Sequence, residues 1–339
     1  MVEDGGHVEG KGFGEFDIIA RYFAPLATDA SALSLRDDAA VLRPPEGLEI
    51  VLSCDTVIEG VHFLSDDPPD SIGHKALAVN LSDLAAKGAR PYVYLLALSL
   101  PATRVTPDWL EAFASGLGDL QRHCGISLAG GDTTKTPGPL CITITALGLV
   151  PHGHAALRHG GKRGDLLYVT GTIGDAYLGL RLLKEPALAA RLGLSEDDVS
   201  FLVGRYREPL PRNAIAIPLR NFASAAIDAS DGLVGDVGKL AAVSHVGAVI
   251  EAARVPLSPA SRKAVVRDPS LLEALLTGGD DYEIVASVPE ASASAFENEI
   301  RAKGETVTQI GRLEERDGIR VLGEGGRTLK LSHKGFAHF

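Results

Sequence analysis

The spacing of hydrophobic and polar residues predicts strands and helices along the whole chain. LEIVLSCDTV (48–57) is a compact apolar run, which is typical of a buried strand. Apolar residues recur at helical spacing over 71–87, and Gly88 is placed to end that helix. The clearest helix is predicted over 106–125, which has a Thr-Pro start, one continuous apolar face and a glycine at its end.

The same alternation continues to the C-terminus. Further strands are predicted over 126–132, 140–150, 166–171, 224–230 and 282–288, and further helices over 175–184, 195–208, 232–244 and 293–304. Two short strands are predicted to close the chain. Because strands and helices mix in both halves, we predict a mixed α/β (α+β) fold.

Length and composition predict two domains. The chain has 339 residues, more than one domain usually holds, and the Gly- and His-rich stretch PHGHAALRHGGKRGD (151–165) interrupts the pattern near its middle. We therefore predict an N-terminal domain over 14–150 and a C-terminal domain over 151–339. Residues 1–13 are acidic and Gly-rich without an apolar core, so they predict a disordered leader rather than a signal peptide.

Charge and cysteine content restrict the possible partners. The formal net charge of -11 argues against broad binding to nucleic acid or to an anionic membrane, although metal ions can still bring a phosphate to an acidic site. The three cysteines, Cys54, Cys124 and Cys141, have no CxxC spacing and fit a reducing compartment, so we predict a cytoplasmic protein. The longest apolar stretch, YVYLLALSLP, is too short to span a bilayer.

Aspartate is the residue type that stands out as a source of chemistry. Aspartates end apolar runs or stand beside small residues at Asp37, Asp38, Asp55, Asp83, Asp132, Asp228, Asp231, Asp280 and Asp281. Any one of them alone is most simply a helix cap or a turn residue. As a set they favour another interpretation, because GGD occurs twice and glycine lets the backbone approach a phosphate. Mg²⁺ commonly bridges carboxylates and substrate phosphates.

Other candidate residues carry weaker signals. The sequence has no Walker motif, no GxGxxG after a strand and no HExxH. His62 follows the strand that bears Asp55, and it is either a half-buried structural histidine or a substrate contact. Arg158 is a surface arginine unless a nucleotide phosphate lies beside it. The connector histidines have no paired ligand motif and are best interpreted as a solvated loop.

Seven stretches, in order, give the chain a family resemblance. They are DDAAV, DTVIEGVHF, KALAVNLSDLAAKGARP, GGDTTK, GDLLYVTGTIGDA, DASDGL and GGDDYE. From about residue 14 to the C-terminus, the sequence resembles the thiamine-monophosphate kinase family, within the superfamily of aminoimidazole ribonucleotide synthetase and selenophosphate synthetase. The resemblance implies a two-domain fold of that superfamily whose N-terminal domains pair in a homodimer. It also implies ATP and several Mg²⁺ ions between the domains.

The resemblance further implies a reaction and a set of site residues. The family transfers the γ-phosphoryl group of ATP directly to thiamine monophosphate (TMP), giving thiamine diphosphate and ADP, and no residue is implied as a general base. Its metal-ligand positions correspond here to Asp38, Ser53, Cys54, Asp55, Asp83, Asp132, Asp228 and Asp231. Its ATP-binding positions correspond to Gly131, Asp132, Arg158 and Ser230, and its TMP-contacting positions to His62, Asp280 and Phe336.

Four positions depart from the family pattern. Arg36 replaces a glycine before the DD motif, and Phe336 replaces a tyrosine, keeping the ring face without the hydroxyl. Cys54 replaces a metal-binding threonine, so only its backbone carbonyl is suited to a hard cation. Asp280 replaces a glutamate and is one methylene shorter, which predicts a longer or water-mediated contact with TMP.

Three alternatives remain open from the sequence. One is another enzyme of the superfamily, such as a selenophosphate synthetase, although no cysteine precedes Cys54 in the Gly-rich N-terminal segment. A phosphate–metal hydrolase would use the same acids to activate water. A catalytically silent nucleotide-binding protein would keep the fold and bind ATP without turnover.

Overall fold

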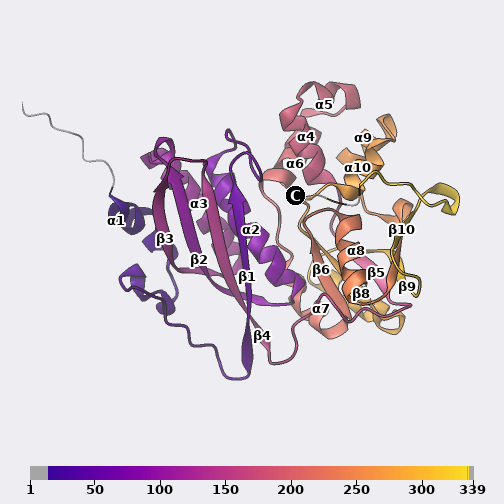
Figure 1. Ribbon diagram of the computed structural model, residues 1–339, viewed down its shortest axis with the longest axis horizontal. Coiled ribbons are helices and arrows are strands. Elements are labelled where there is room, and N and C mark those ends of the chain that lie inside the picture. Colours follow the sequence, from indigo (N-terminus) through magenta and orange to yellow (C-terminus); the bar gives the residue numbers. More distant parts are fainter. Residues whose placement is uncertain (1–13, 334, 336–339) are drawn as a thin grey trace, which may run out of the picture.

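Two β-sheets, each with its own helices, make up the molecule (Figure 1). The computed structural model describes residues 14–333 and residue 335. The leader expected over 1–13 and the predicted contact residue Phe336 lie outside the described residues. Strands and helices mix in both halves, so the prediction of a mixed α/β fold is confirmed.

The first sheet belongs to the N-terminal half. Its strand order is β1-β4-β2-β3, with β1 (Leu48–Ile58), β2 (Arg90–Pro101), β3 (Ser127–Thr136) and β4 (Cys141–Pro151). The β1–β4 and β4–β2 pairs are antiparallel, whereas β2 and β3 are parallel. Helices α2 (Pro69–Ala86) and α3 (Pro107–Cys124) pack against each other, and α2 also contacts β1 and β4, so this sheet has a helix-covered face.

The second sheet has the order β10-β7-β9-β5-β8-β6. Its strands are β5 (Leu166–Thr170), β6 (Ala225–Ala229), β7 (Gly247–Glu251), β8 (Glu283–Val288), β9 (Val307–Glu314) and β10 (Ile319–Leu322). Helix α8 (Leu233–Val243) covers one face, while α7 (Ala216–Phe222) and α11 (Ala293–Ala302) cover the other. A separate helical cluster contains α4 (Asp175–Lys184), α5 (Ala187–Leu192), α6 (Glu196–Arg207), α9 (Pro259–Arg267) and α10 (Leu271–Thr277).

Helix α2 lies between the two halves. Most of its residues are buried, because it packs on β1 and β4 on one side and on β6 and β8 on the other. A helix that is apolar nearly all round is suited to such a central position. The polar side chains of Lys75, Asn80 and Ser82 on α2 are therefore buried near the junction of the two halves.

The clearest sequence predictions are confirmed. Thr106 caps α3 by accepting the Trp109 N–H, and Gly125 ends it with a left-handed φ of 67°. Strands β1, β5, β6 and β8 and helices α4, α6, α8 and α11 lie where the periodicity predicts them. Strands β2 and β7 and helices α5, α7, α9 and α10 were not predicted. The four helices have nine residues or fewer, too few for a clear helical period, whereas β2 is a 12-residue apolar run that was recognised only as too short to span a bilayer. None of the described helices is both long and apolar enough to cross a membrane.

Candidate functional site

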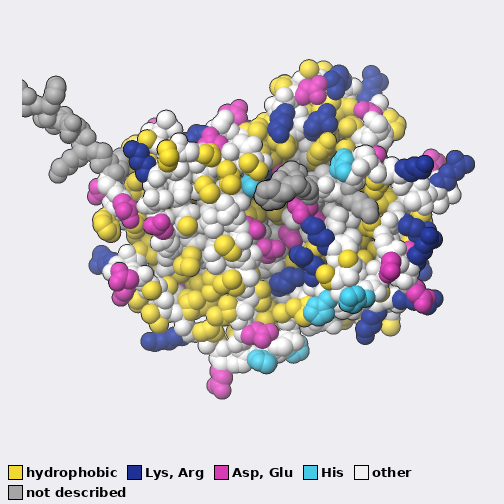
Figure 2. All heavy atoms as spheres, viewed as in Figure 1, with side chains coloured by type: hydrophobic (Ala, Val, Ile, Leu, Met, Phe, Trp, Pro, Cys, Tyr) yellow, Lys and Arg dark blue, Asp and Glu magenta, His cyan; other side chains and the backbone are white. Residues whose placement is uncertain are grey.

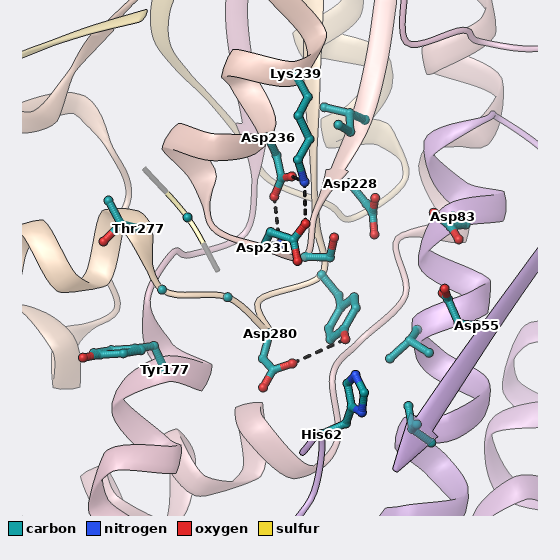
Figure 3. A pocket seen from close by; sticks show the side chains of 18 of the residues that line it. Asp55, His62, Asp83, Tyr177, Asp228, Asp231, Asp236, Lys239, Thr277 and Asp280 are labelled. Carbon is teal, nitrogen blue, oxygen red and sulfur yellow. Dashed lines mark hydrogen bonds and ion pairs between the residues drawn. The ribbon is translucent and has the colours of Figure 1, made fainter. Parts of the chain in front are cut away.

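A cavity of about 750 Å³ opens between the two halves of the molecule, and side chains from both line it (Figures 2 and 3). The N-terminal half contributes Asp55 and His62 around the end of β1, and Asp83 from α2. The predicted site residues that the second half contributes are Arg158, Asp228, Ser230, Asp231 and Asp280. The cavity thus brings together eight of the thirteen predicted site residues that the structure describes.

Strand β1 and helix α2 hold the acids of the N-terminal half in place. The side chains of Ser53 and Asp55 point toward α2, where Ser53 Oγ donates a hydrogen bond to the Asp83 carboxylate. The backbone N–H of Asp55 donates to Asn80 Oδ1 at 3.0 Å, one helical turn before Asp83. The exposed Cys54 side chain lies on the opposite face of the sheet, where its Sγ accepts a hydrogen bond from Thr145 Oγ1.

The turn between β6 and α8 holds the acids of the second half. Asp228 is buried at the end of β6, and Ser82 Oγ of α2 donates to its Oδ2 at 3.1 Å. The chain then turns through Gly232, whose φ of 118° would strain any residue with a Cβ. The Asp231 N–H donates to Asp236 Oδ2 at 3.0 Å, which fixes Asp231 at the start of the helix.

The acids in the cavity repel one another. Burial and the nearby carboxylates of Asp83 and Asp231 raise the pKa of Asp55 to about 6. Burial, followed by the charges of Asp83 and Asp236, raises the pKa of Asp228 to about 8. Burial is the largest cause of both shifts and the neighbouring carboxylates add to it, so a bound cation would stabilise the ionised form of these groups.

Lys239 of α8 is a cation beside these acids, and its role was not predicted from the sequence. Its Nζ lies 2.8 Å from Asp236 Oδ1 and also contacts the carboxylate of Asp231 (Figure 3). Asp236 and Lys239 stand three residues apart on one helix, five and eight residues after Asp231. This helical spacing in DGLVGDVGK was the signal that could have identified both residues.

His62 and Asp280 lie at another part of the same cavity, which Tyr177 also lines (Figure 3). The His62 Nδ1 accepts a hydrogen bond from the Ile58 N–H at 3.0 Å, which keeps that nitrogen unprotonated. Asp280 has a positive φ of 73°, and its N–H donates to the Ser230 carbonyl at 2.8 Å. The GGDDYE segment is thereby joined directly to the turn that bears Asp231.

The other five predicted residues that the structure describes do not line this cavity. Asp38, Gly131 and Asp132 line a second cavity of about 650 Å³, on the N-terminal sheet and the segment before β1. Ser53 and Cys54 do not line the first cavity, although Ser53 contacts Asp83. Within residues 14–333 and 335, no group of three or more His, Cys, Asp or Glu side chains is arranged to hold a metal ion by itself.

Two family models match the chain. The N-terminal domain of AIR synthase related proteins matches residues 36–150, and the C-terminal domain of the same proteins matches residues 162–324. The fold and the cavity between the halves therefore define an AIR synthase related protein.

Similar curated proteins identify the family within this class. Thiamine-monophosphate kinase of Escherichia coli K12 is 41% identical over 330 residues, covering 96% of this chain and 98% of that protein. Thiamine-monophosphate kinase of Bacillus subtilis is 32% identical over 330 residues, covering 96% and 99%. The chain belongs to the thiamine-monophosphate kinase family.

Solved structures agree with this placement. The crystal structure of thiamine-monophosphate kinase from Stenotrophomonas maltophilia K279a superposes with a TM-score of 0.81 at 39% identity, covering 93% of this chain and 97% of that one. AaThiL complexed with AMPPCP and TMP superposes with a TM-score of 0.75 at 30% identity, covering 89% and 91%.

Proposed function

We propose that this protein is a kinase that transfers the γ-phosphoryl group of ATP to the phosphate of TMP, giving thiamine diphosphate and ADP. The observation that carries the proposal is the single cavity in which acids of both halves meet Arg158, Ser230, His62 and Asp280. The relatives named thiamine-monophosphate kinase, and the AaThiL complex with an ATP analogue and TMP, support the same substrates.

The acids of the cavity fit Mg²⁺. Mg²⁺ prefers carboxylate oxygens and usually completes its shell with water and substrate phosphates, so a site without three preformed protein ligands is compatible with it. The raised pKa values of Asp55 and Asp228 identify carboxylates that a cation would stabilise. We propose that Asp55, Asp83, Asp228 and Asp231 hold the ions, which would offset the repulsion between the two phosphorylated substrates.

The protein's own groups would bind and orient the two substrates. Arg158 and Ser230 would contact the nucleotide, and His62 and Asp280 the thiamine part of TMP. The acceptor oxygen belongs to a phosphate that is already anionic at neutral pH, so the reaction needs no protein general base. The principal task of the cavity is therefore to align the acceptor oxygen with the γ-phosphorus.

We also propose that the protein is a homodimer paired through its N-terminal sheet. Leu52 is 62% exposed, and Ile50 and Leu95 are exposed on the same sheet. Figure 2 shows hydrophobic side chains gathered over the region where Figure 1 draws the strands of this sheet. An exposed apolar sheet face of this kind is suited to a second copy. Asp38, Gly131 and Asp132 lie in the groove beside Leu52 and Leu95, so the partner subunit would complete their surroundings.

The three cysteines are unpaired, which supports the proposed cytoplasmic location.

A coupled product assay tests the proposed function. Purified protein is incubated with ATP, Mg²⁺ and TMP, and thiamine diphosphate is measured as its thiochrome while ADP is measured in parallel. Equal amounts of both products, lost with EDTA, are expected. ADP without thiamine diphosphate would instead indicate a hydrolase or another acceptor, and ATP binding without either product a catalytically silent protein.

The Asp231→Asn variant tests the proposed metal site. It is expected to need more Mg²⁺ for half-maximal turnover and to lose at least about 100-fold in kcat, since Mg²⁺ loses a charged ligand. The exposed Asp317→Asn is the control and is expected to behave as the wild type. Unchanged Mg²⁺ dependence and turnover in Asp231→Asn would remove that residue from the site.

A further inference from the structure

Lys75 is a charged side chain in the buried centre of the molecule. It lies on helix α2, and its side chain is only 2% exposed. It does not line the cavity, but its nearest partners include two residues that do. A buried ammonium group is costly unless it is fully paired, so a lysine in this position needs an explanation.

Three groups surround the Lys75 ammonium. Its Nζ donates to the His62 carbonyl at 2.9 Å and to Asp280 Oδ2 at 3.3 Å. It also lies 3.8 Å from the centre of the Tyr206 ring, within the range of a cation–π contact. The Tyr206 hydroxyl donates to the same His62 carbonyl at 3.3 Å, so Lys75 and Tyr206 bind one backbone oxygen together.

These partners come from separate segments of the chain. His62 follows β1, Tyr206 belongs to α6, and Asp280 precedes β8. Lys75 contacts all three of them. The other Asp280 oxygen accepts a contact of similar length, 3.4 Å, from the Tyr282 hydroxyl. Because Lys75 is charged and Tyr282 is neutral, the ammonium is the stronger of the two constraints on where the Asp280 carboxylate points.

We propose that Lys75 is a positioning residue for the thiamine end of the cavity, acting through Asp280 and His62. The inference rests on the proposed function, in which these two residues contact TMP. Asp280 lines the cavity with a short side chain, so the direction of its carboxylate decides what it can reach. Lys75 fixes that direction and ties the N-terminal half to the second half beside the substrate.

The role predicts an effect on one substrate alone. Arg158, Ser230 and Asp231 have no contact with Lys75, so nucleotide binding is expected to be kept when Lys75 is replaced. TMP binding is expected to weaken, because Asp280 and the His62 backbone lose a charge-assisted partner. If Lys75 only supported the fold, replacing it would change the affinities for TMP and for the nucleotide together, or change neither.

Titration calorimetry on the full-length protein distinguishes these cases. The dissociation constants of TMP, with AMPPCP and Mg²⁺ present, and of AMPPCP alone are measured for wild type, Lys75→Met, Asp280→Asn and the double variant. Lys75→Met is expected to weaken TMP binding about 10-fold or more and to leave AMPPCP binding within about twofold. The double variant is expected to lose less TMP affinity than the product of the two single losses, since both changes break the Lys75–Asp280 pair. Lys263→Met, which removes a lysine paired with Asp198 on the outer helices, is the control.

The other outcomes overturn the inference in different ways. Tighter TMP binding by Lys75→Met would mean that the ammonium merely opposes the cationic thiamine ring. Equal loss of both ligands, or no loss, would make Lys75 structural while the proposed function stands. Wild-type protein that binds AMPPCP but not TMP would refute the proposed function and this inference together.

A second variant covers the case in which Lys75→Met does not fold. Tyr206→Leu keeps the ammonium but removes the ring beneath it and the second donor to the His62 carbonyl. It is expected to weaken TMP binding about threefold or more at unchanged AMPPCP affinity. Unchanged TMP affinity in a folded Tyr206→Leu protein would contradict the proposed role of this cluster.

Discussion

Asp228 ends strand β6 with a buried carboxyl whose pKa is raised to about 8 by burial and by the charges of Asp83 and Asp236. In the unfolded chain the same group ionises near its ordinary value of 3.8. The folded protein therefore holds this proton more tightly than the unfolded chain does. Between pH 4 and pH 8, stability falls as pH rises, and above pH 8 the penalty is complete.

The Asp228→Asn variant makes this cost measurable. The amide has a similar shape and never ionises, so the variant is expected to unfold at a higher temperature than wild type in metal-free buffer. The difference is expected to grow from pH 5 to pH 8, to reach about 5 °C, and to stay constant above pH 8. Calorimetry in EDTA at a series of pH values provides the measurement, with the exposed Asp317→Asn as control. A difference that shrinks as pH rises would contradict the assigned cause.

Single residues also show the limit of sequence motifs. The aspartates of DTV, NLSDL and DASDG were recognisable because they follow apolar runs or stand beside small residues. Lys75 and Lys239 were not recognisable, because a lysine in a helix usually points to solvent. Only their contacts with Asp280, Asp231 and Asp236 give these lysines a role.

At the scale of elements, the close packing of α2 on α3 places the acids of α2. A Cβ at Gly116 would lie 1.9 Å from the Asp70 carbonyl oxygen, and one at Gly73 would lie 2.4 Å from that of Phe113. Both clashes are with backbone, which cannot move aside as a side chain can. The two helices can approach this closely only because each has a glycine at the crossing.

The Gly116→Ala variant tests this packing. It is expected to lower the free energy of unfolding by about 2 kcal/mol, because the helices must separate to admit the methyl group. Gly204→Ala in α6 is the matched control: a Cβ there meets no atom within 4 Å, and alanine favours the helix by up to about 1 kcal/mol. The free energies of unfolding of both variants are measured by denaturant unfolding. If both were equally stable, the α2–α3 contact would be looser than described.

At the scale of the whole molecule, the two halves share one cavity and the first sheet leaves an apolar face exposed. That face carries Ile50, Leu52 and the side chain of Cys54 on alternate positions of β1. The same alternation turns Ser53 and Asp55 toward the helices. One strand therefore serves both the proposed metal site and the proposed dimer contact.

The Leu52→Asp variant tests the proposed dimer. A charge on this exposed face is expected to convert the dimer into monomers at micromolar concentration, as measured by light scattering after size exclusion. Val266 is 79% exposed on helix α9 of the other half, so Val266→Asp is a control of the same chemistry and should remain dimeric. A wild-type monomer, or a Leu52→Asp dimer, would refute pairing through this sheet.

Local order along the chain was determined by the sequence itself. Helix α3 was predictable in full, because its cap, its apolar face and its terminal glycine are interactions within about 20 residues. The strands that bear Asp55 and Asp228 were predictable for the same reason, since an apolar run is a local feature, although β1 continues to Ile58, past the end predicted at Asp55. The family motifs then indicated which residues are expected to bind metal, ATP and TMP.

Only the tertiary structure decided which of these residues meet. Asp83 of α2 and Asp228 of β6 are 145 residues apart in sequence but share one cavity, because α2 packs against both sheets. Asp38 and Asp132, equally prominent in sequence, lie in a second cavity instead. Local patterns cannot distinguish these cases, since the distance between two strand ends depends on the order of strands in a sheet and on the helix between sheets. Those arrangements arise from the burial of apolar faces by the whole chain.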